Sequence, residues 1–377
     1  MILKNNYLIS FVIGTRPEAI KMAPLILEFK KSKSIKTNII LSGQHKEMVQ
    51  PIMDIFDLKE VVNFDVLGRC KSLEQTTSLI LSELGNFFDE LRPDLVFVQG
   101  DTITAFAGAL SAFFKNIPVA HVEAGLRTES IFSPFPEEAN RRMISQLTSL
   151  HFAPTKLASD NLLKNGIKKN IFVSGNTVVD ALNLVSDKKI NFRLEGIDIF
   201  NEKFILTTVH RRENWGEPLK NIAKAILTVV EKNDGIKVIL PMHKNPLVRN
   251  ILIEQLGNNK NIFLIDPLPY FEFILTLKNA FVVLTDSGGI QEEAHTLGKP
   301  ILILRNSTER PEVIFNGNGL LVGTDSKKIE LELNKLLKVS KEYEEFKEFK
   351  KNLNTFGNGD SSKLIFKETI DFLRKNN

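Results

Sequence analysis

The sequence predicts an α/β fold made of two Rossmann-like, doubly wound domains with a cleft between them. Short apolar runs alternate with amphipathic helical patterns along most of the 377 residues. Nearly all of these runs are continuously apolar, which is typical of parallel strands buried on both faces. The candidate strands are too numerous for one ordinary sheet, and a polar, irregular stretch interrupts the series.

The elements follow in chain order. Strands are expected at residues 8–13, 37–41, 95–98, 118–121 and 171–173 in the first half, and at 204–209, 238–240, 262–265, 281–284 and 301–304 in the second. Crossover helices are expected at 18–30, 73–91 and 219–231. The polar stretch at 186–201 is the expected linker. It separates an N-terminal domain, residues 1–185, from a C-terminal domain, residues 186–360. The last helical pattern, within 361–377, is expected to pack back on the first domain.

Composition excludes several classes of protein. A hydrophobic content of 43%, a charged content of 25% and a net charge of +4 are typical of a soluble globular protein and give no support to a nucleic-acid partner. The single cysteine, Cys70, excludes an intrachain disulfide and a thiolate metal cluster, and the six histidines show no metal spacing. The sequence shows neither a signal peptide nor a membrane span, so we expect a cytoplasmic protein without a metal site.

A nucleotide diphosphate site is predicted at Gly288 and Gly289, which lie between an apolar run and a helical pattern. Glycines let a ligand approach the main chain, and the N–H groups of the following helix favour an anion. Glu293 lies one turn further along and could accept hydrogen bonds from a ribose. The alternative is a strand-to-helix connection that merely needs glycine, but such a connection would require neither Ser287 nor Glu293.

Three more residues of the second half follow strands or lie in loops where they could contact phosphate. His210 could donate to a phosphate oxygen and, as a cation, would favour a departing diphosphate. His243 occupies the same level on the next strand, and a structural role is equally compatible with it. Arg310 adds a further cation.

In the first half, the residues after the first strand bring positive charge to the predicted cleft. Arg16 follows Gly14, and Lys21 lies one turn into the next helix. Ligands bind beyond the carboxyl ends of strands in open α/β sheets, so both are candidate ligands of an anion. Gly14 has no glycine partner at the spacing of a dinucleotide fingerprint, which disfavours NAD or NADP.

Three carboxylates are candidate acid/base groups. Asp101 and Glu123 each follow a strand of the same sheet, and Glu137 opens a helix. Each also has a structural interpretation, as a helix cap, a loop contact or a first-turn acid. Carboxylates that lie close together can act as an acid and a base, because one can hold a proton while another stays ionised.

These motifs together resemble the non-hydrolysing UDP-N-acetylglucosamine 2-epimerase family from about residue 11 to about residue 325. The matching blocks are GTRPEAIKMAP (14–24), GDT (100–102), HVEAGLRT (121–128), PEEAN (136–140), SGNT (174–177), HRRE (210–213), TDSGGIQEEA (285–294) and TERPE (308–312). The resemblance implies a glycosyltransferase-B type fold, a homodimer and interconversion of UDP-GlcNAc with UDP-ManNAc for cell-envelope polysaccharides.

The family chemistry implies elimination of UDP to a bound 2-acetamidoglucal, followed by re-addition of UDP, without a redox cofactor. Carried over by position, Asp101, Glu123 and Glu137 form the acid/base group. The residues that hold UDP are Arg16, Lys21, His210, Ser287, Gly288, Gly289 and Glu293, with main-chain contacts near Phe273 and with Arg310 near the sugar or the diphosphate.

Some features depart from the family pattern or leave alternatives open. Val209 and Trp215 lie beside matched positions. A regulatory subclass of the family has two glutamines in one segment; here Gln44 matches the first, and Glu47 occupies the place of the second. The rival functions are a 2-epimerase of another UDP-sugar, a hydrolysing epimerase that releases ManNAc and UDP, a retaining glycosyltransferase and a non-catalytic UDP-sugar sensor. The last two do not require the three carboxylates.

Overall fold

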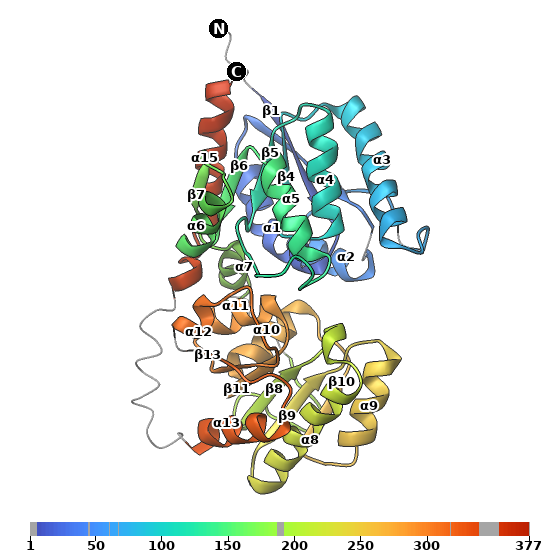
Figure 1. Cartoon of the computed structure of the whole chain (residues 1–377), viewed down its shortest axis with the longest axis vertical. Coiled ribbons are helices and arrows are strands. Elements are labelled where there is room, and N and C mark those ends of the chain that lie inside the picture. The colour runs from blue at the N-terminus through green and yellow to red at the C-terminus, as the bar shows by residue number, and fades with distance from the viewer. Residues whose placement is uncertain are drawn as a thin grey trace. The chain divides into compact units, whose positions relative to one another are not determined.

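The computed structural model describes residues 6–43, 46–59, 61–66, 68–186, 192–316, 318–338 and 354–376. The chain divides into two compact units, each a sheet covered by helices (Figure 1). Unit 1 comprises Met1–Leu184 and Phe356–Asn377, and unit 2 comprises Val185–Thr355.

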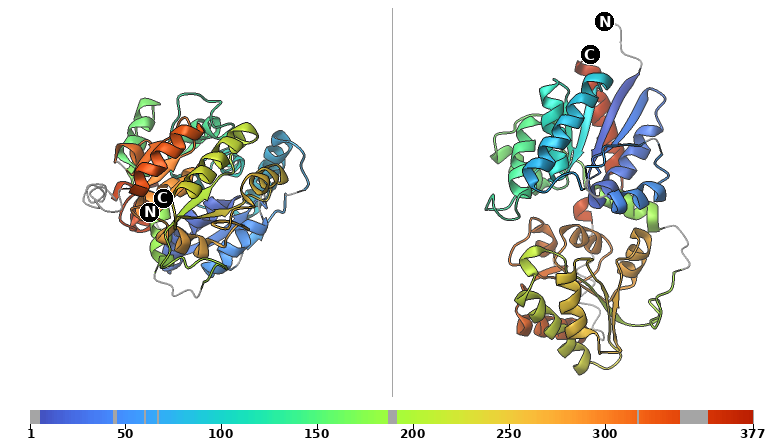
Figure 2. Two further views of the ribbon diagram at one scale, coloured as in Figure 1. Left: turned by 90° about the horizontal axis from the view of Figure 1, so that it is seen from below. Right: turned by 90° about the vertical axis from the view of Figure 1, so that its right-hand side faces the viewer.

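The sheet of unit 1 has the order β3-β2-β1-β4-β5-β6-β7 in the described part of the chain, with parallel pairing throughout. Its strands are β1 (Tyr7–Ile13), β2 (Ile35–Leu41), β3 (Val61–Asn63), β4 (Leu95–Gln99), β5 (Val119–Val122), β6 (Leu150–Ala153) and β7 (Ile171–Val173). Its helices are α1 (Arg16–Lys30), α2 (Lys46–Ile55), α3 (Leu73–Leu91), α4 (Ile103–Phe114), α5 (Glu137–Leu147), α6 (Lys156–Lys164), α7 (Thr177–Ser186) and α15 (Ser361–Asn376). Helices cover both faces of this sheet, as Figure 2 shows.

Aromatic side chains hold α15 on unit 1, beside α1. The ring of Phe366 on α15 meets that of Phe29 on α1 edge-on, with 5.0 Å between the ring centroids. Phe29 in turn contacts Phe97 on β4, so the C-terminal helix is continuous with the core of the sheet. The main-chain N–H of Ser362 also donates to Asp180 Oδ1 at 2.8 Å, which satisfies one of the first amides of α15.

The sheet of unit 2 has the order β10-β9-β8-β11-β12-β13 in the described residues and is also parallel. Its strands are β8 (Phe204–Thr208), β9 (Lys237–Pro241), β10 (Ile262–Ile265), β11 (Val282–Thr285), β12 (Ile301–Ile303) and β13 (Gly319–Leu321). Its helices are η1 (Arg212–Asn214), α8 (Glu217–Lys232), α9 (Pro246–Leu256), α10 (Tyr270–Asn279), α11 (Gly288–Thr296), α12 (Glu312–Phe315) and α13 (Ser326–Lys338). The apolar face of α8 lies in the buried core of this unit.

The sequence missed three strands, β3, β6 and β13. Each has only three or four residues, too few to show a period. Of the expected linker, residues 187–191 lie outside the described part, and residues 192–201 form a loop with one isolated bridge between Leu194 and Ile197.

Each sheet has a point at which the strand order reverses. In unit 1 this switch lies between β1 and β4, and in unit 2 it lies between β8 and β11. Open parallel sheets bind ligands beyond the carboxyl ends of the strands at such points. The loops after these four strands are therefore where each unit is expected to carry chemistry.

Candidate functional site

A buried cluster of three polar side chains lies at the strand ends of unit 1. Lys21 of α1 forms an ion pair with Glu123, which directly follows β5, and both side chains are 5% exposed. Gln99, at the end of β4, donates from Nε2 to Glu123 Oε2 at 2.7 Å. The backbone of Glu123 has φ 64°, a left-handed conformation that is uncommon outside glycine and is enriched at functional sites. The carboxylate of Glu123 is thus fixed from two sides.

The first turn of α1 is tied to the loop after β4 by Glu18. Its carboxylate accepts hydrogen bonds from the N–H groups of Gly14 at 3.0 Å and Thr15 at 2.6 Å, and from the hydroxyl of Thr102 at 2.7 Å. Burial raises the pKa of Glu18 to about 7, although these hydrogen bonds act in the opposite direction. Arg16, the first residue of the helix, is half-buried beside this anchor.

Asp101 is held by α5. Arg141 donates from Nε to Asp101 Oδ2 at 2.7 Å, and Asn140 donates to the Asp101 main-chain carbonyl at 2.9 Å. Arg141 also pairs with Glu138, whose side chain is fully buried, at 2.6 Å. Glu137 lies three and four residues before these two donors and therefore on the helix face that meets Asp101.

In unit 2, the turn from β11 into α11 has the predicted form. Ser287 is the N-cap residue, and its hydroxyl does not cap the helix. A Cβ added at Gly289 would meet no heavy atom within 4 Å, so the main chain there has open space beside it. A Cβ at Gly288 would lie 2.4 Å from Arg310 Nη1, so the Arg310 side chain approaches the main chain closely at this glycine. Glu293 is buried one turn further along.

Arg310 belongs to a buried network of charges. It pairs with Glu292 at 2.5 Å and with Glu309 at 2.7 Å. Arg305 binds the other oxygen of Glu309 at 2.7 Å and Glu213 at 3.0 Å. Two carboxylates therefore oppose the charge of Arg310, which limits the positive field it can offer a ligand.

Two histidines of unit 2, His210 and His243, lie side by side. The rings of His210 and His243 are 6.4 Å apart between centroids and 21° from parallel. His210 follows β8, and its Nδ1 lies 3.2 Å from Asp286 Oδ1. Phe273 is buried on α10, and its main-chain N–H donates to the Pro269 carbonyl at 2.9 Å, so that amide is already used within the helix.

Gln99, Arg141 and Asp286 are among the residues that the sequence did not single out but that contact predicted ones. All three stand in or beside matched motifs: Gln99 precedes the GDT block and Asp286 lies inside the TDSGGIQEEA block. Arg141 comes one residue after the PEEAN block. Motif membership was the available signal, but sequence alone could not say which partner each residue contacts.

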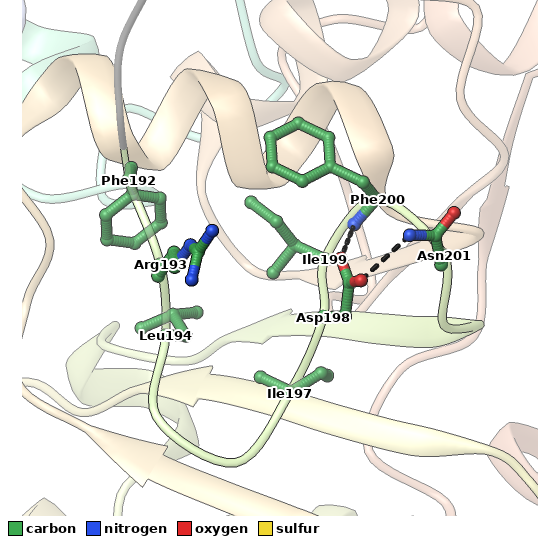
Figure 3. Close-up of a pocket in the computed structure, with 8 residues that line it drawn as sticks. All are labelled: Phe192, Arg193, Leu194, Ile197, Asp198, Ile199, Phe200 and Asn201. Atoms are coloured by element: carbon green, nitrogen blue, oxygen red, sulfur yellow. Dashed lines mark hydrogen bonds between the residues drawn. The ribbon is translucent and has the colours of Figure 1, made fainter.

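A pocket of about 430 Å³ lies elsewhere in unit 2, along the loop of residues 192–201 (Figure 3). Asp198 closes this loop on itself by accepting hydrogen bonds from the Phe200 N–H at 3.0 Å and the Asn201 side-chain amide at 2.8 Å. The pocket contains no predicted site residue. The strand-end clusters are the better candidate because polar groups converge there at the switch points.

The described residues contain neither a membrane-spanning helix nor a cluster of metal-binding side chains. No helix in that part of the chain combines the length and apolar character needed to cross a bilayer. No group of three or more histidine, cysteine, aspartate or glutamate side chains is arranged there to hold a metal ion. Of the positions weighed for regulation, Gln44 and the side chain of Glu47 lie outside the described residues.

Two parallel, doubly wound sheets, each with polar groups at its switch point, define a protein of the glycosyltransferase-B architecture. A crystal structure of a glycotransferase of kitacinnamycin, 13% identical with a TM-score of 0.60, covers 96% of this chain and 99% of its own and shares the fold alone.

The family is defined more narrowly by sequence. The family model described as UDP-N-acetylglucosamine 2-epimerase matches residues 27–369, and the chain belongs to that family. The UDP-N-acetylglucosamine 2-epimerase of Bacillus subtilis (strain 168) is 44% identical over 361 residues, which cover 95% of this chain and 94% of the relative. The crystal structure of UDP-GlcNAc 2-epimerase from Neisseria meningitidis bound to UDP-GlcNAc has 41% identity and a TM-score of 0.91, and covers 97% of this chain and 100% of its own.

Proposed function

We propose that this epimerase interconverts UDP-GlcNAc and UDP-ManNAc without hydrolysis, by eliminating UDP and adding it back. The observation that carries the proposal is the buried Lys21–Glu123 pair with Gln99. It supports a role for Glu123 in proton transfer, since a carboxylate held by a cation and an amide has a fixed position and orientation. The relatives that bind UDP-GlcNAc support the choice of substrate.

In the proposed reaction, a base removes the proton from the sugar carbon that carries the acetamido group. The electron pair forms a double bond to the anomeric carbon, and the bond from that carbon to the diphosphate oxygen breaks. UDP then adds back to the anomeric carbon while a proton is delivered to the opposite face of the neighbouring carbon. The substrate and product have the same oxidation state, so the steps balance without a redox partner.

We assign the proton transfers to Asp101, Glu123 and Glu137 in unit 1. Asp101 is oriented by Arg141, and Glu137 lies on the helix face that meets it, so these two carboxylates are candidates for a shared proton path.

We assign the UDP contacts in unit 2 to His210, His243, Ser287, Gly288, Gly289, Glu293 and the α10 segment around Phe273. The open space at Gly289 and the N-terminal amides of α11 support a diphosphate contact there. Arg16 and Lys21 in unit 1 add positive charge. We assign Arg310 near the sugar or the diphosphate, with its charge shared with Glu292 and Glu309.

The proposal also includes a homodimer that acts in the cytoplasm and supplies cell-envelope polysaccharide synthesis. Phe113 and Phe114, at the end of α4, are 52% and 61% exposed and provide apolar surface that a protein interface could cover. Light scattering coupled to size-exclusion chromatography tests the dimer: twice the chain mass supports it and a single chain mass rejects it.

Proton NMR of the purified protein with UDP-GlcNAc in deuterated buffer tests the reaction. Growth of UDP-ManNAc, with deuterium entering at the carbon that bears the acetamido group, would support the proposal. Release of free ManNAc with one UDP per turnover would assign the protein to hydrolysis instead. No change, followed by turnover of a different UDP-sugar under the same conditions, would keep the 2-epimerase chemistry but overturn the substrate.

A further inference from the structure

Asp286 is a fully buried carboxylate that joins the two loops at the switch point of unit 2. It directly follows β11, and its oxygens accept hydrogen bonds from three groups in the loop after β8. These donors are the main-chain N–H of His210 at 3.0 Å, the main-chain N–H of Arg211 at 2.9 Å and the side-chain amide of Asn214 at 3.0 Å. A buried carboxylate with three donors is rigidly placed.

The same carboxylate also meets the ring of His210. Asp286 Oδ1 lies 3.2 Å from His210 Nδ1, and the histidine side chain is 42% exposed whereas the aspartate is not exposed at all. A carboxylate at one ring nitrogen sets the orientation of an imidazole and the nitrogen that carries the proton. With Nδ1 turned to Asp286, Nε2 is the nitrogen on the opposite, outward edge.

We propose that Asp286 is a positioning residue that presents His210 Nε2 to the diphosphate. This inference rests on the proposed function, in which His210 contacts UDP. Asp286 is suited to the role because the next residues along the chain are Ser287, Gly288 and Gly289. Asp286 therefore fixes the position of the histidine donor relative to the N-terminal amides of α11.

A purely structural role is the alternative, and the chain offers a matched control for it. Thr208 and Thr285 join the same two strands through their hydroxyls, which lie 2.6 Å apart. Thr208→Val should weaken the coupling between the strands and leave UDP binding within about twofold of wild type. If Thr208→Val and Asp286→Asn lose equal UDP affinity, strand coupling rather than ring orientation is responsible and the proposal is overturned.

The decisive experiment is a double-mutant cycle with Asp286→Asn and His210→Asn, measured as UDP affinity by calorimetry and as kcat and KM. For metal-ligating histidines, loss of the partner that orients the ring costs about 10- to 100-fold in affinity or activity. We expect a loss of that size for Asp286→Asn alone and less than about twofold in the His210→Asn background. Equal losses in both backgrounds would show that Asp286 does not act through the histidine.

Two further measurements keep the inference testable if a variant misfolds or the proposed reaction is wrong. Asn214→Ala removes one donor to Asp286 and should give a smaller affinity loss that again requires His210. Nitrogen-15 NMR of the His210 ring, which needs no turnover, should show a proton on Nδ1 in the wild type. A ring with its proton on Nε2 and a bare Nδ1 would overturn the inference even if the protein proves to be an active epimerase.

Discussion

Lys21 and Glu123 form a buried ion pair between α1 and the end of β5, 102 residues apart in sequence. A buried pair is costly to desolvate, so its presence at a strand end is better explained by chemistry than by stability. Gln99 completes the environment of the carboxylate from β4. The pair fixes the carboxylate that is proposed to transfer protons beside the cation that is proposed to contact the substrate.

The first prediction concerns the two carboxylates at these strand ends. Glu123→Gln and Asp101→Asn should each lower kcat by about 100- to 10,000-fold, because general acid–base catalysis contributes that much. UDP affinity should change by less than about threefold, since neither residue is assigned to UDP. Calorimetry and the NMR assay measure the two effects separately.

Asp160→Asn is the matched control for these variants, because Asp160 pairs with Lys156 on α6 and is not assigned to the site. It should leave kcat unchanged. Near-normal turnover in both Glu123→Gln and Asp101→Asn would refute the acid/base assignment. Loss of UDP binding in either variant would instead place that carboxylate among the UDP contacts.

The second prediction compares two arginines that share one buried carboxylate, Glu138. Arg141 binds it at 2.6 Å with a side chain that is 4% exposed, and Arg142 binds it at 2.8 Å with a side chain that is 40% exposed. Arg141→Met should destabilise unit 1 by about 3–5 kcal/mol, because the fully buried Glu138 loses the more buried of its two arginine partners. Arg142→Met should cost less than about 1 kcal/mol.

Thermal and urea unfolding of the two variants measure this difference. Equal costs would mean that burial does not distinguish the two ion pairs. Because Arg141 also holds Asp101, its variant should lose turnover even at temperatures where it is fully folded.

The third prediction follows from the carboxyl group of Glu18. Its pKa is raised by burial from 4.5 to about 7, so the folded state keeps a proton that the unfolded chain releases. The folded state is therefore favoured at low pH, and stability falls as the pH rises from 4.5 to about 7. Above that range, ionisation of the buried Glu18 carboxyl lowers the free energy of unfolding by the full amount, on the order of 3 kcal/mol.

Urea unfolding of wild type and Glu18→Gln at pH 5 and pH 8 measures this effect. The variant should gain stability relative to wild type as the pH rises. Glu90→Gln, at an exposed position on α3, is the control and should track the wild type. If the free energy of unfolding changes equally between the two pH values in Glu18→Gln and in the wild type, Glu18 titrates near its ordinary pKa.

Site residues that are marked by their neighbours in the sequence could be predicted, whereas contacts between residues far apart in the sequence could not. Glu123 and Gly289 were identified because each follows an apolar run within a few residues, and Lys21 because it lies one turn into the helix that follows the first strand. Their partners depend on the order of strands in the sheet: Asp286 contacts His210 from 76 residues away, across the switch between β8 and β11. Apolar runs show that strands exist but do not give that order, so sequence alone could not find these contacts.

Arg310 shows the same limit for a residue that was predicted. Its charge made it a candidate for a phosphate contact, whereas its location beside Glu292 and Glu309 depends on the folding of α11 against the loop before α12. A sequence shows that a charge is present but not how much of it is already neutralised.

The fourth prediction uses the two adjacent glycines of α11 as a matched pair. An alanine Cβ at position 289 meets open space, and alanine is the better helix former, so Gly289→Ala should be as stable as wild type or more stable by about 0.5–1 kcal/mol. If a diphosphate approaches the main chain at that point, the new methyl group occupies its place, and UDP affinity should fall by at least about 10-fold. At position 288 the Cβ would lie 2.4 Å from Arg310 Nη1, an atom held by Glu309.

Gly288→Ala should therefore displace the arginine and cost about 1–3 kcal/mol of stability, the usual penalty for overpacking. Unfolding and UDP calorimetry on both variants separate a glycine that serves packing from one that serves a ligand. Full UDP affinity in a stable Gly289→Ala protein would mean that no phosphate approaches this turn. The glycine pair would then be only a connection between strand and helix, and the UDP contacts would have to be sought elsewhere in unit 2.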